Sequence, residues 1–414
     1  MIADSLVHDT DVIASKREPG LHFRIVREFS HHEREVWDDF VRSAPNGHLM
    51  QGWSWGEYMR RLGWEPVRFG VVRRNRLIAA AQMMLMHSPF GATRAYVPKG
   101  PACFAFDDMS YDMLLDALHW HARSHGAISL RVEPHEPATS PVGDVLKRHG
   151  FQPSEYTLRP NQPRATIVVD LSGGPDAVFA RMKKNTRNLV RSASSRLSVR
   201  AASEEDDIVR FHALLEEVAG RRDFDARPIA HLQAMYEELG PRQEAEIFLA
   251  ELDGEVIAGQ MVLAYGADGI AMYGGWSTAY SHIPAIRLLD WESIKWCIER
   301  GCTRYDFWDA FDKPSIHPRQ DPTAPLTEDE IEPDALGVFR YKRSFGGTSI
   351  IFTGAYDYVY SPSVYWMWEQ VSETKKKGKE LLGQTRNRVA DILDSISRKP
   401  VSISEVPNTL RTTQ

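Results

Sequence analysis

Two stretches of the chain repeat each other, and this internal repeat restricts the fold more than any other feature of the sequence. Residues 71–85 read VVRRNRLIAAAQMML, and residues 248–263 read FLAELDGEVIAGQMVL. Each stretch has the pattern of a strand, a short polar turn and a second strand, which is typical of a β-hairpin. The phrase AAQMML of the first matches AGQMVL of the second, with Gln82 and Gln260 in the same place. We therefore expect two copies of one domain.

The similarity continues beyond the hairpins in the same order and at nearly constant spacing. A further strand follows each hairpin and leads through Tyr96 or Tyr273 into a glycine-containing turn. A helix with the sequence Leu-Leu-Asp then ends at Gly126 or Gly301, before another strand. This order of helices, antiparallel strands, a helix and a strand is that of an acyltransferase of the GNAT type. We predict a mixed α/β (α+β) fold of two tandem GNAT-like acyltransferase domains.

The length of 414 residues also favours two globular domains, because single domains cluster near about 100–200 residues. The proline-containing segment 151–163 is expected to connect them. We expect a disordered N-terminus, a first domain, a second domain and a C-terminal helix with a tail, at residues 1–20, 21–163, 164–361 and 362–414. The tail has helical apolar spacing and a basic face, which could contact anionic lipid, although a solvated helix face explains the same pattern.

Cysteine usage and charge restrict the compartment and the class of protein. Three cysteines at unrelated spacings predict neither a disulfide framework nor a metal site. The N-terminus has no apolar run of signal length, and no stretch of about 18 uninterrupted apolar residues predicts a membrane span. A net charge of −6 argues against a protein that coats nucleic acid, although a local basic patch could still bind one phosphate-rich ligand. We expect a cytoplasmic protein.

Eight short segments resemble the FemX (FemABX) peptidyltransferase family, in the order and at the places where that family carries them. They are QGWSWG (51–56), YVPKGP (96–101) and LRVEP (130–134) in the first half, and MKKNTRNLVRSA (182–193), RRDFDAR (221–227), MYGGWS (272–277), GCTRYDFWDA (301–310) and GVFRYKRSFGG (337–347) in the second. The resemblance implies a non-ribosomal aminoacyltransferase for cell-wall synthesis. Its donor would be aminoacyl-tRNA, and its acceptor the stem-peptide amine of a UDP- or lipid-linked muramyl-pentapeptide. We expect a monomer without cofactor or metal, in peripheral contact with the inner membrane surface at most.

Two residues are the catalytic candidates. Aminolysis of an ester needs alignment and stabilisation of the developing oxyanion more than a covalent nucleophile. In the family the lysine that matches Lys342 is implicated near the reacting ester, which a cation would stabilise. Asp306, at the end of a strand, could orient the amine, although an aspartate there could equally cap the next turn.

Binding residues follow from charge and from the resemblance. Arg222 and Arg227 are expected to hold the phosphates or carboxylates of the precursor, because guanidinium groups form bidentate contacts with both. Further substrate-binding candidates lie in the resembling segments: Trp55, Tyr96, Lys99 and Tyr273. The family tends to carry a phosphate-binding lysine where this chain has Met59, and the neighbouring Arg60 or Arg61 could replace it.

A basic stripe is the candidate for tRNA binding. Lys184, Arg187 and Arg191 share one face of a predicted helix and could bind phosphates, although a solvated helix would look the same. Three nearby histidines, His119, His121 and His125, do not share one helix face, so no metal site is expected. The proline-rich and acidic segment 313–334 is expected to form a mobile cover.

Two other functions fit the sequence. An acyl-CoA N-acyltransferase of the same fold would carry an R/Q-x-x-G-x-G/A loop for pyrophosphate, and residues 343–348 lack its final glycine or alanine. A catalytically silent protein that only binds the precursor or cell-wall partners is the other alternative, and Met59 in place of a lysine favours it.

Overall fold

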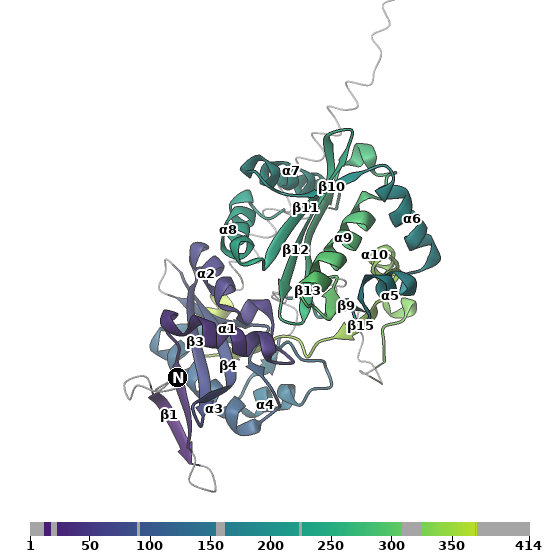
Figure 1. Ribbon diagram of the computed structural model, residues 1–414. Coiled ribbons are helices and arrows are strands. Elements are labelled where there is room, and N and C mark those ends of the chain that lie inside the picture. Colours follow the sequence, from purple (N-terminus) through teal and green to yellow (C-terminus); the bar gives the residue numbers. More distant parts are fainter. Residues whose placement is uncertain are drawn as a thin grey trace, which may run out of the picture. The chain divides into compact units, whose positions relative to one another are not determined.

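The structure, a computed structural model, describes residues 12–17, 23–88, 92–154, 162–222, 226–308, 321, 324–368 and 370. The chain divides into two compact units, residues 1–361 and 362–414. In the second unit residues 362–368 are helical, and most of that unit lies outside the described part. The first unit contains two mixed β-sheets with helices packed against them (Figure 1). The predicted fold class is confirmed.

The first sheet has the strand order β1-β2-β3-β4-β5-β7-β16-β8, with β6 paired to β4. Its strands are β1 (Val12–Arg17), β2 (Phe23–Glu28), β3 (Glu65–Arg73), β4 (Arg76–His87), β5 (Thr93–Pro98), β6 (Ala102–Cys103), β7 (Ala127–Glu133), β8 (Gln152–Pro153) and β16 (Tyr356–Val359). The helices of this half are α1 (Arg34–Ser43), α2 (Trp53–Arg61), α3 (Asp108–Ser124) and α4 (Val142–Arg148).

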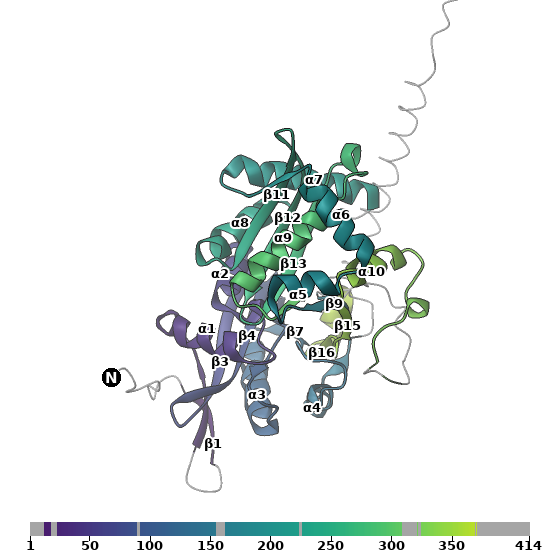
Figure 2. The same ribbon diagram turned by 45° about the vertical axis from the view of Figure 1, so that its right-hand side comes forward.

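The second sheet has the order β10-β11-β12-β13-β14-β9-β15. Its strands are β9 (Ala165–Asp170), β10 (Ser198–Ala201), β11 (Ala245–Leu252), β12 (Glu255–Tyr265), β13 (Asp268–Trp276), β14 (Arg304–Asp306) and β15 (Thr348–Ile351). Its helices are α5 (Gly174–Arg181), α6 (Lys184–Ser194), α7 (Glu205–Arg222), α8 (Ile229–Leu239), α9 (Ala285–Glu299) and α10 (Leu336–Arg343). The helices α5, α6, α9 and α10 gather beside this sheet (Figure 2).

The internal repeat corresponds to matching elements of the two sheets. The hairpin β3–β4 turns at Arg74 and Asn75 and the hairpin β11–β12 at Asp253 and Gly254, all four with positive φ. Such a pair of left-handed residues closes a two-residue turn whose twist suits the flanking strands. In each half the next strand runs parallel to the strand that follows the Leu-Leu-Asp helix, as β5 with β7 and β13 with β14.

One hydrophobic core joins the two halves. Buried side chains of α1 and α2, such as Trp37 and Trp53, belong to the same cluster as Phe211 of α7 and Met261 of β12. A polar contact reinforces this core, because the Tyr265 hydroxyl donates to the Asp38 carboxylate across 2.9 Å. The two halves are therefore held together by buried surface as well as by the connecting chain.

Two segments fall elsewhere than the sequence placed them. Residues 12–17, expected in a disordered N-terminus, form the edge strand β1. Residues 356–359, expected in the second domain, form β16 between β7 and β8 of the first sheet. The local sequence Tyr-Asp-Tyr-Val suits a strand in either sheet, so strand propensity alone could not assign it. Of the expected mobile cover at 313–334, residues 321 and 324–334 are described, and Leu326 and Ile331 pack into a buried cluster of the second half. Residues 313–320, 322 and 323 lie outside the described part.

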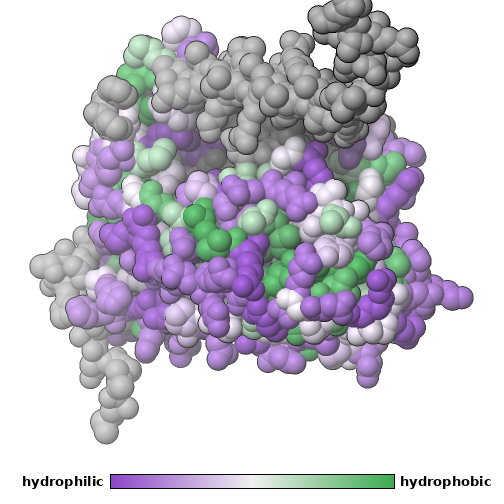
Figure 3. Space-filling view, turned by 90° about the horizontal axis from the view of Figure 1, so that it is seen from above, coloured by the Kyte–Doolittle hydropathy of each residue, from purple (hydrophilic) through white to green (hydrophobic). Residues whose placement is uncertain are grey.

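One face of the molecule is mainly polar. The face seen from above in Figure 3 shows hydrophilic side chains around smaller apolar areas. Within the described part of the chain, no helix combines the length and the apolar character that a membrane crossing requires.

Candidate functional site

An opening between two parallel strands marks the second sheet. β13 pairs with β14 only over Asp268–Ile270, opposite Arg304–Asp306. Beyond that point β13 continues along β12 with a β-bulge between the pairs of Ala271 and Tyr273. The chain after β14 instead continues along β9, with which β14 is paired, and Phe307 donates its N–H to the Ile167 carbonyl. The two strands therefore separate, and bulges of this kind often re-aim a strand beside an active site.

The first sheet keeps its equivalent strands together. β5 pairs with β7 from Thr93 to Pro98, along the whole of the strand. Tyr96, which matches Tyr273 in the repeat, is buried there, donates its hydroxyl to Glu133 at 2.7 Å and accepts from Gln162 at 2.9 Å. The predicted substrate-binding Tyr96 is thus held by two side chains of its own half. Of the two repeats, the second presents the opening.

Both predicted catalytic residues contact the backbone of Trp308. The Trp308 N–H donates to the Asp306 carboxylate at 2.7 Å, and its carbonyl accepts from the Lys342 ammonium. Trp308 has a φ of +43°, a left-handed conformation that a tryptophan rarely adopts without such support. Its ring stacks on His48 at a centroid distance of 5.7 Å. Asp306 and Lys342 therefore meet at one point, at the end of β14.

Burial controls the proton affinity of Asp306. The side chain is buried and also accepts from the Thr166 hydroxyl. Burial raises the pKa of Asp306 above its usual value, although the positive charges of Lys99 and Lys342 oppose that rise. A carboxyl group with a raised pKa beside a lysine can exchange a proton with a bound amine.

Lys99 extends from the end of β5 toward this same point. It is only 2% exposed, and its ammonium lies 3.8 Å from the centre of the Phe352 ring and 5.3 Å from that of Trp308. Burial lowers the pKa of Lys99 to about 8, and the negative charge of Asp306 is the main opposing influence. The structure thus brings the predicted substrate-binding Lys99 next to the two predicted catalytic residues.

Gln51 explains why the motifs QGWSWG and YVPKGP lie together. Its buried amide donates to the Pro98 carbonyl at 2.6 Å and accepts from the Gln82 N–H at 2.7 Å. A Cβ atom at Gly100 would lie 2.4 Å from the Gln51 side chain, so a glycine is needed there. The two motifs therefore pack together directly beside Lys99.

His48 and His135 belong to this site, and the sequence interpretation named neither. Their rings lie 4.7 Å apart, and burial lowers the pKa of each well below its usual value. Both are therefore neutral at pH 7, which avoids a further positive charge beside Lys99. Their positions, three residues before the start of QGWSWG and directly after LRVEP, are the signal that could have pointed to them.

A second group contains three more of the predicted binding residues. The charge of Arg227 opposes the rise in pKa that burial causes at Tyr273 and at Tyr58. Trp55 packs edge-on against Tyr58 at 5.1 Å and is 6% exposed. Tyr58 was missed, although it lies three residues after Trp55 and so on the same side of α2. Arg222 is the last residue of α7, and its side chain lies outside the described part.

The arginines beside Met59 are engaged elsewhere. Arg60 forms an ion pair with Glu57 at 3.0 Å, and Arg61 pairs with Glu237 and Glu238 of α8. Met59 itself is partly buried against the core that joins the halves. The ion pairs of Arg61 therefore link α2 to α8.

The predicted tRNA-binding residues all lie on α6, which begins beside the end of α10, where the Lys183 N–H donates to the Ser344 carbonyl at 2.9 Å. Lys184 and Arg191 are exposed, and Arg191 lies 5.0 Å from the Phe179 ring. Arg187 is partly buried and donates to the carbonyls of Ala180 and Met182 at the end of α5. The stripe thus consists of two exposed cations and one that also closes a helix end.

Comparison with known proteins places the chain among relatives that share both halves. The model of the FemAB family matches residues 32–256 and 253–373. Lipid II:glycine glycyltransferase of Staphylococcus aureus (strain MRSA252) is 20% identical, over 85% of this chain and 97% of that protein. The crystal structure of FemX superposes with a TM-score of 0.71 and 20% identity, over 83% of this chain and 99% of that one. A conserved protein of unknown function from Bacteroides thetaiotaomicron superposes with a TM-score of 0.52 and 10% identity, over 80% and 98%.

Proposed function

This chain belongs to the FemAB family, and from that premise we propose that it transfers an amino acid from aminoacyl-tRNA to the stem-peptide amine of a peptidoglycan precursor. The name of its S. aureus relatives, lipid II:glycine glycyltransferase, supports the transferase activity and the class of acceptor. The observation that carries the proposal is the opening between β13 and β14, with Asp306 and Lys342 at its base.

In this proposal the opening receives the ester of the donor. The amine of the acceptor attacks the ester carbonyl, and the Lys342 ammonium stabilises the oxyanion that develops. Asp306 orients the amine and accepts a proton from it as the C–N bond forms. The ester C–O bond then breaks, and the tRNA hydroxyl leaves with the proton that Asp306 took from the amine, which restores the carboxylate. The step therefore needs neither a covalent enzyme intermediate nor a cofactor.

The remaining contacts divide between the two substrates. Arg227, Tyr273 and Tyr58 offer a cation and two hydroxyl groups for precursor phosphates, and Arg222 adds a second cation. Lys184 and Arg191 bind tRNA phosphates, which makes transfer sensitive to salt. We further propose that a cytoplasmic monomer carries out the reaction and meets lipid-linked precursor at the inner membrane surface.

The turn after α10 is unsuited to the pyrophosphate of acyl-CoA. The segment from Arg343 to Thr348 follows the C-terminal end of a helix, where backbone carbonyls rather than N–H groups are available. The connection 277–284 from β13 into α9 contains no glycine, and Pro284, which has no N–H, precedes that helix. Both features favour an aminoacyl ester over acyl-CoA as the donor.

In the test, the purified protein is incubated with tRNA charged with glycine, alanine or serine. UDP-linked or lipid-linked muramyl-pentapeptide is added as the acceptor. Mass spectrometry of the precursor should show a gain of one amino-acid residue with at least one pair. Controls without protein and with uncharged tRNA should show no gain. The absence of any gain across all pairs would reject the proposed function.

Replacing Lys342 tests the catalytic assignment. Lys342→Ala removes the cation and the hydrogen bond to the Trp308 carbonyl, so transfer should fall by about 10- to 1000-fold. Arg343→Ala, which removes an exposed cation from the next position of α10, is the matched control and should retain near wild-type transfer. Thermal unfolding of both variants verifies the fold. Equal rates for wild type and Lys342→Ala would remove Lys342 from the mechanism.

A further inference from the structure

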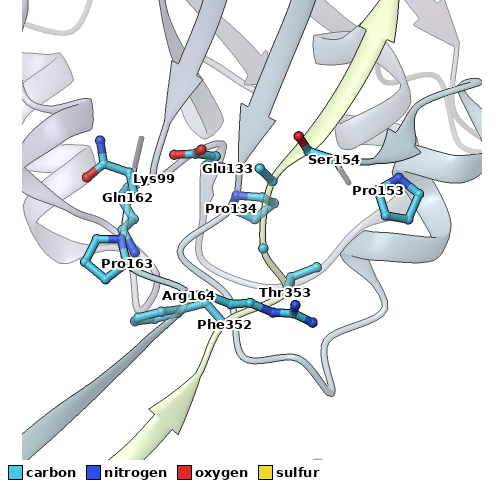
Figure 4. A pocket seen from close by; sticks show the side chains of 12 residues that line it. Lys99, Glu133, Pro134, Pro153, Ser154, Gln162, Pro163, Arg164, Phe352 and Thr353 are labelled. Atoms are coloured by element: carbon cyan, nitrogen blue, oxygen red, sulfur yellow. The ribbon is translucent and has the colours of Figure 1, made fainter. Parts of the chain in front are cut away.

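A cavity lies where the chain crosses between the two sheets. One crossing leads from β8 to β9, and the other returns from β15 to β16, where the Phe352 N–H donates to the Arg164 carbonyl at 2.8 Å. The cavity has a volume of about 150 Å³, roughly the space of one small ring or short branched group. Figure 4 shows side chains from both crossings around it. Its lining combines the charged side chains of Lys99, Glu133 and Arg164 with Ser154 and with apolar side chains such as Phe352.

Lys99 is the feature of the wall that points to a ligand. Its side chain is 98% buried, and its described contacts are with the rings of Phe352 and Trp308. Within the part of the chain that the structure describes, no oxygen accepts a hydrogen bond from its ammonium group. A buried ammonium without an acceptor is costly, and the lowered pKa of Lys99 reflects that cost. An anionic group in the cavity would supply the acceptor.

The other residues that line the cavity restrict the charge and the shape of the anionic ligand. Arg164 adds a second positive charge, and Glu133 contributes one negative charge, already engaged by the Tyr96 hydroxyl. The two positive side chains of the lining favour an anionic ligand. The Ser154 hydroxyl accepts from Arg131 at 2.9 Å and keeps its own proton for donation. Pro134, Pro163 and Phe352 leave room for a small apolar group beside the anion.

We propose that this cavity binds the C-terminal carboxylate of a short peptide, with Lys99 as its principal contact. The inference rests on the proposed function, because the peptide is then the free end of the acceptor's stem. Lys99 reaches both the cavity and Trp308, whose backbone Asp306 and Lys342 hold. A peptide anchored by its carboxylate at Lys99 would direct its preceding residues toward the catalytic pair.

The test compares two forms of the muramyl-pentapeptide precursor, one ending in a carboxylate and the other in a carboxamide. The two differ by one charge and hardly in size. Isothermal titration with wild-type protein should give a Kd for the carboxamide that is about 10- to 100-fold weaker, because a charge-assisted hydrogen bond is lost. Equal Kd values for the two forms would overturn the proposal.

Lys99→Met assigns the effect to this side chain. The variant has an unbranched, uncharged side chain that is one atom shorter, and the ratio of the two Kd values should fall to about one. Lys147→Met, at an exposed lysine of α4, is the matched control and should keep the wild-type ratio. A folded Lys99→Met protein that retains the ratio would also overturn the proposal. If Lys99→Met does not fold, the wild-type ratio alone decides.

The two proposals fail in different ways. Absence of transfer to both precursor forms rejects the enzyme function, whereas the ratio of Kd values is measured without tRNA. Transfer that proceeds with equal Kd values for the two forms rejects the carboxylate site and leaves the enzyme function standing.

Discussion

At the scale of single residues, the site is built from charged groups that stability alone does not favour. Lys99 and Asp306 are both buried, and burial shifts the pKa of each toward its neutral form. The free energy that such groups cost must come from the core around them. Lys342 lies partly buried beside them, so three ionisable groups share one region of low polarity.

Lys99 should make the stability of the protein depend on pH. The pKa of this lysine is about 8 in the folded chain and about 10.5 when it is unfolded, so the unfolded chain holds the proton more tightly. The free energy of unfolding should therefore rise between about pH 8 and pH 10.5 through this group. Lys99→Met should be more stable than wild type by up to about 3 kcal/mol below pH 8, with the difference shrinking toward pH 10.5.

Denaturant unfolding of both proteins at pH 7, 8, 9 and 10 provides the measurement. Lys147→Met again serves as the control, and its difference from wild type should stay constant with pH. A Lys99→Met difference that does not change with pH would contradict the described burial of this ammonium.

At the scale of elements, the bulged strand β13 depends on close packing with α7. Gly275 lies where a Cβ atom would be 2.8 Å from backbone atoms of Leu214 and Leu215. Backbone cannot move aside as a flexible side chain can, so glycine at this position lets the helix approach the strand. The same strand contains Tyr273, which lies on the β13 side of the opening. The packing of α7 against β13 therefore helps to fix the position of this strand.

Gly275→Ala should displace α7 from β13 and lower the free energy of unfolding by about 1–3 kcal/mol. The matched control lies in the same helix, because a Cβ atom at Gly220 meets no atom within 4 Å. Gly220→Ala should raise the free energy of unfolding by about 0.5–1 kcal/mol, as expected inside a helix. Thermal or urea unfolding of the two variants measures the effects, and equal effects of the two changes would rule out the close contact.

At the scale of the whole first unit, the two halves share one core and several polar contacts. Arg42 pairs with Glu244 at 2.6 Å, and the Tyr265 hydroxyl donates to Asp38 at 2.9 Å. A Cβ atom at Gly52 would lie 2.8 Å from the Tyr265 ring, so the halves meet there without spare room. Residues 12–361 are therefore expected to unfold cooperatively.

Tyr265→Phe tests that cooperativity. The change removes one hydrogen bond to the buried Asp38 and should lower the free energy of unfolding by about 1 kcal/mol. Hydrogen exchange followed by mass spectrometry should show an equal loss of protection in β4 of the first sheet and β12 of the second. A loss confined to the second sheet would show instead that the halves open independently.

Much of this architecture could be predicted from the sequence because the repeat is local. Short sequence patterns are enough to predict the hairpins, the strands that contain Tyr96 and Tyr273, and the Leu-Leu-Asp helices. The position of β16 could not be predicted, because its strand pattern is compatible with either sheet and only tertiary packing decides between them.

The candidate site, too, could be predicted from the sequence only in part. Lys342, Asp306 and Lys99 lie in recognisable segments, and the structure brings them together. His48, His135 and Tyr58 were missed because their importance arises from neighbours far along the chain, such as Trp308 and Arg227. Single-sequence patterns report periodicity and turns, whereas burial between distant segments is a property of the folded chain.

The position of β16 between β7 and β8 sets an order for events at the ribosome. β7 and β8 leave the ribosome early, yet the strand that separates them in the sheet ends at Val359. The first sheet therefore stays incomplete until nearly the whole second half has been translated. N-terminal domains usually fold first during synthesis, but here the earlier half must wait for a strand encoded after the later one. A nascent chain arrested before residue 356 should thus expose the edges of β7 and β8 to chaperones.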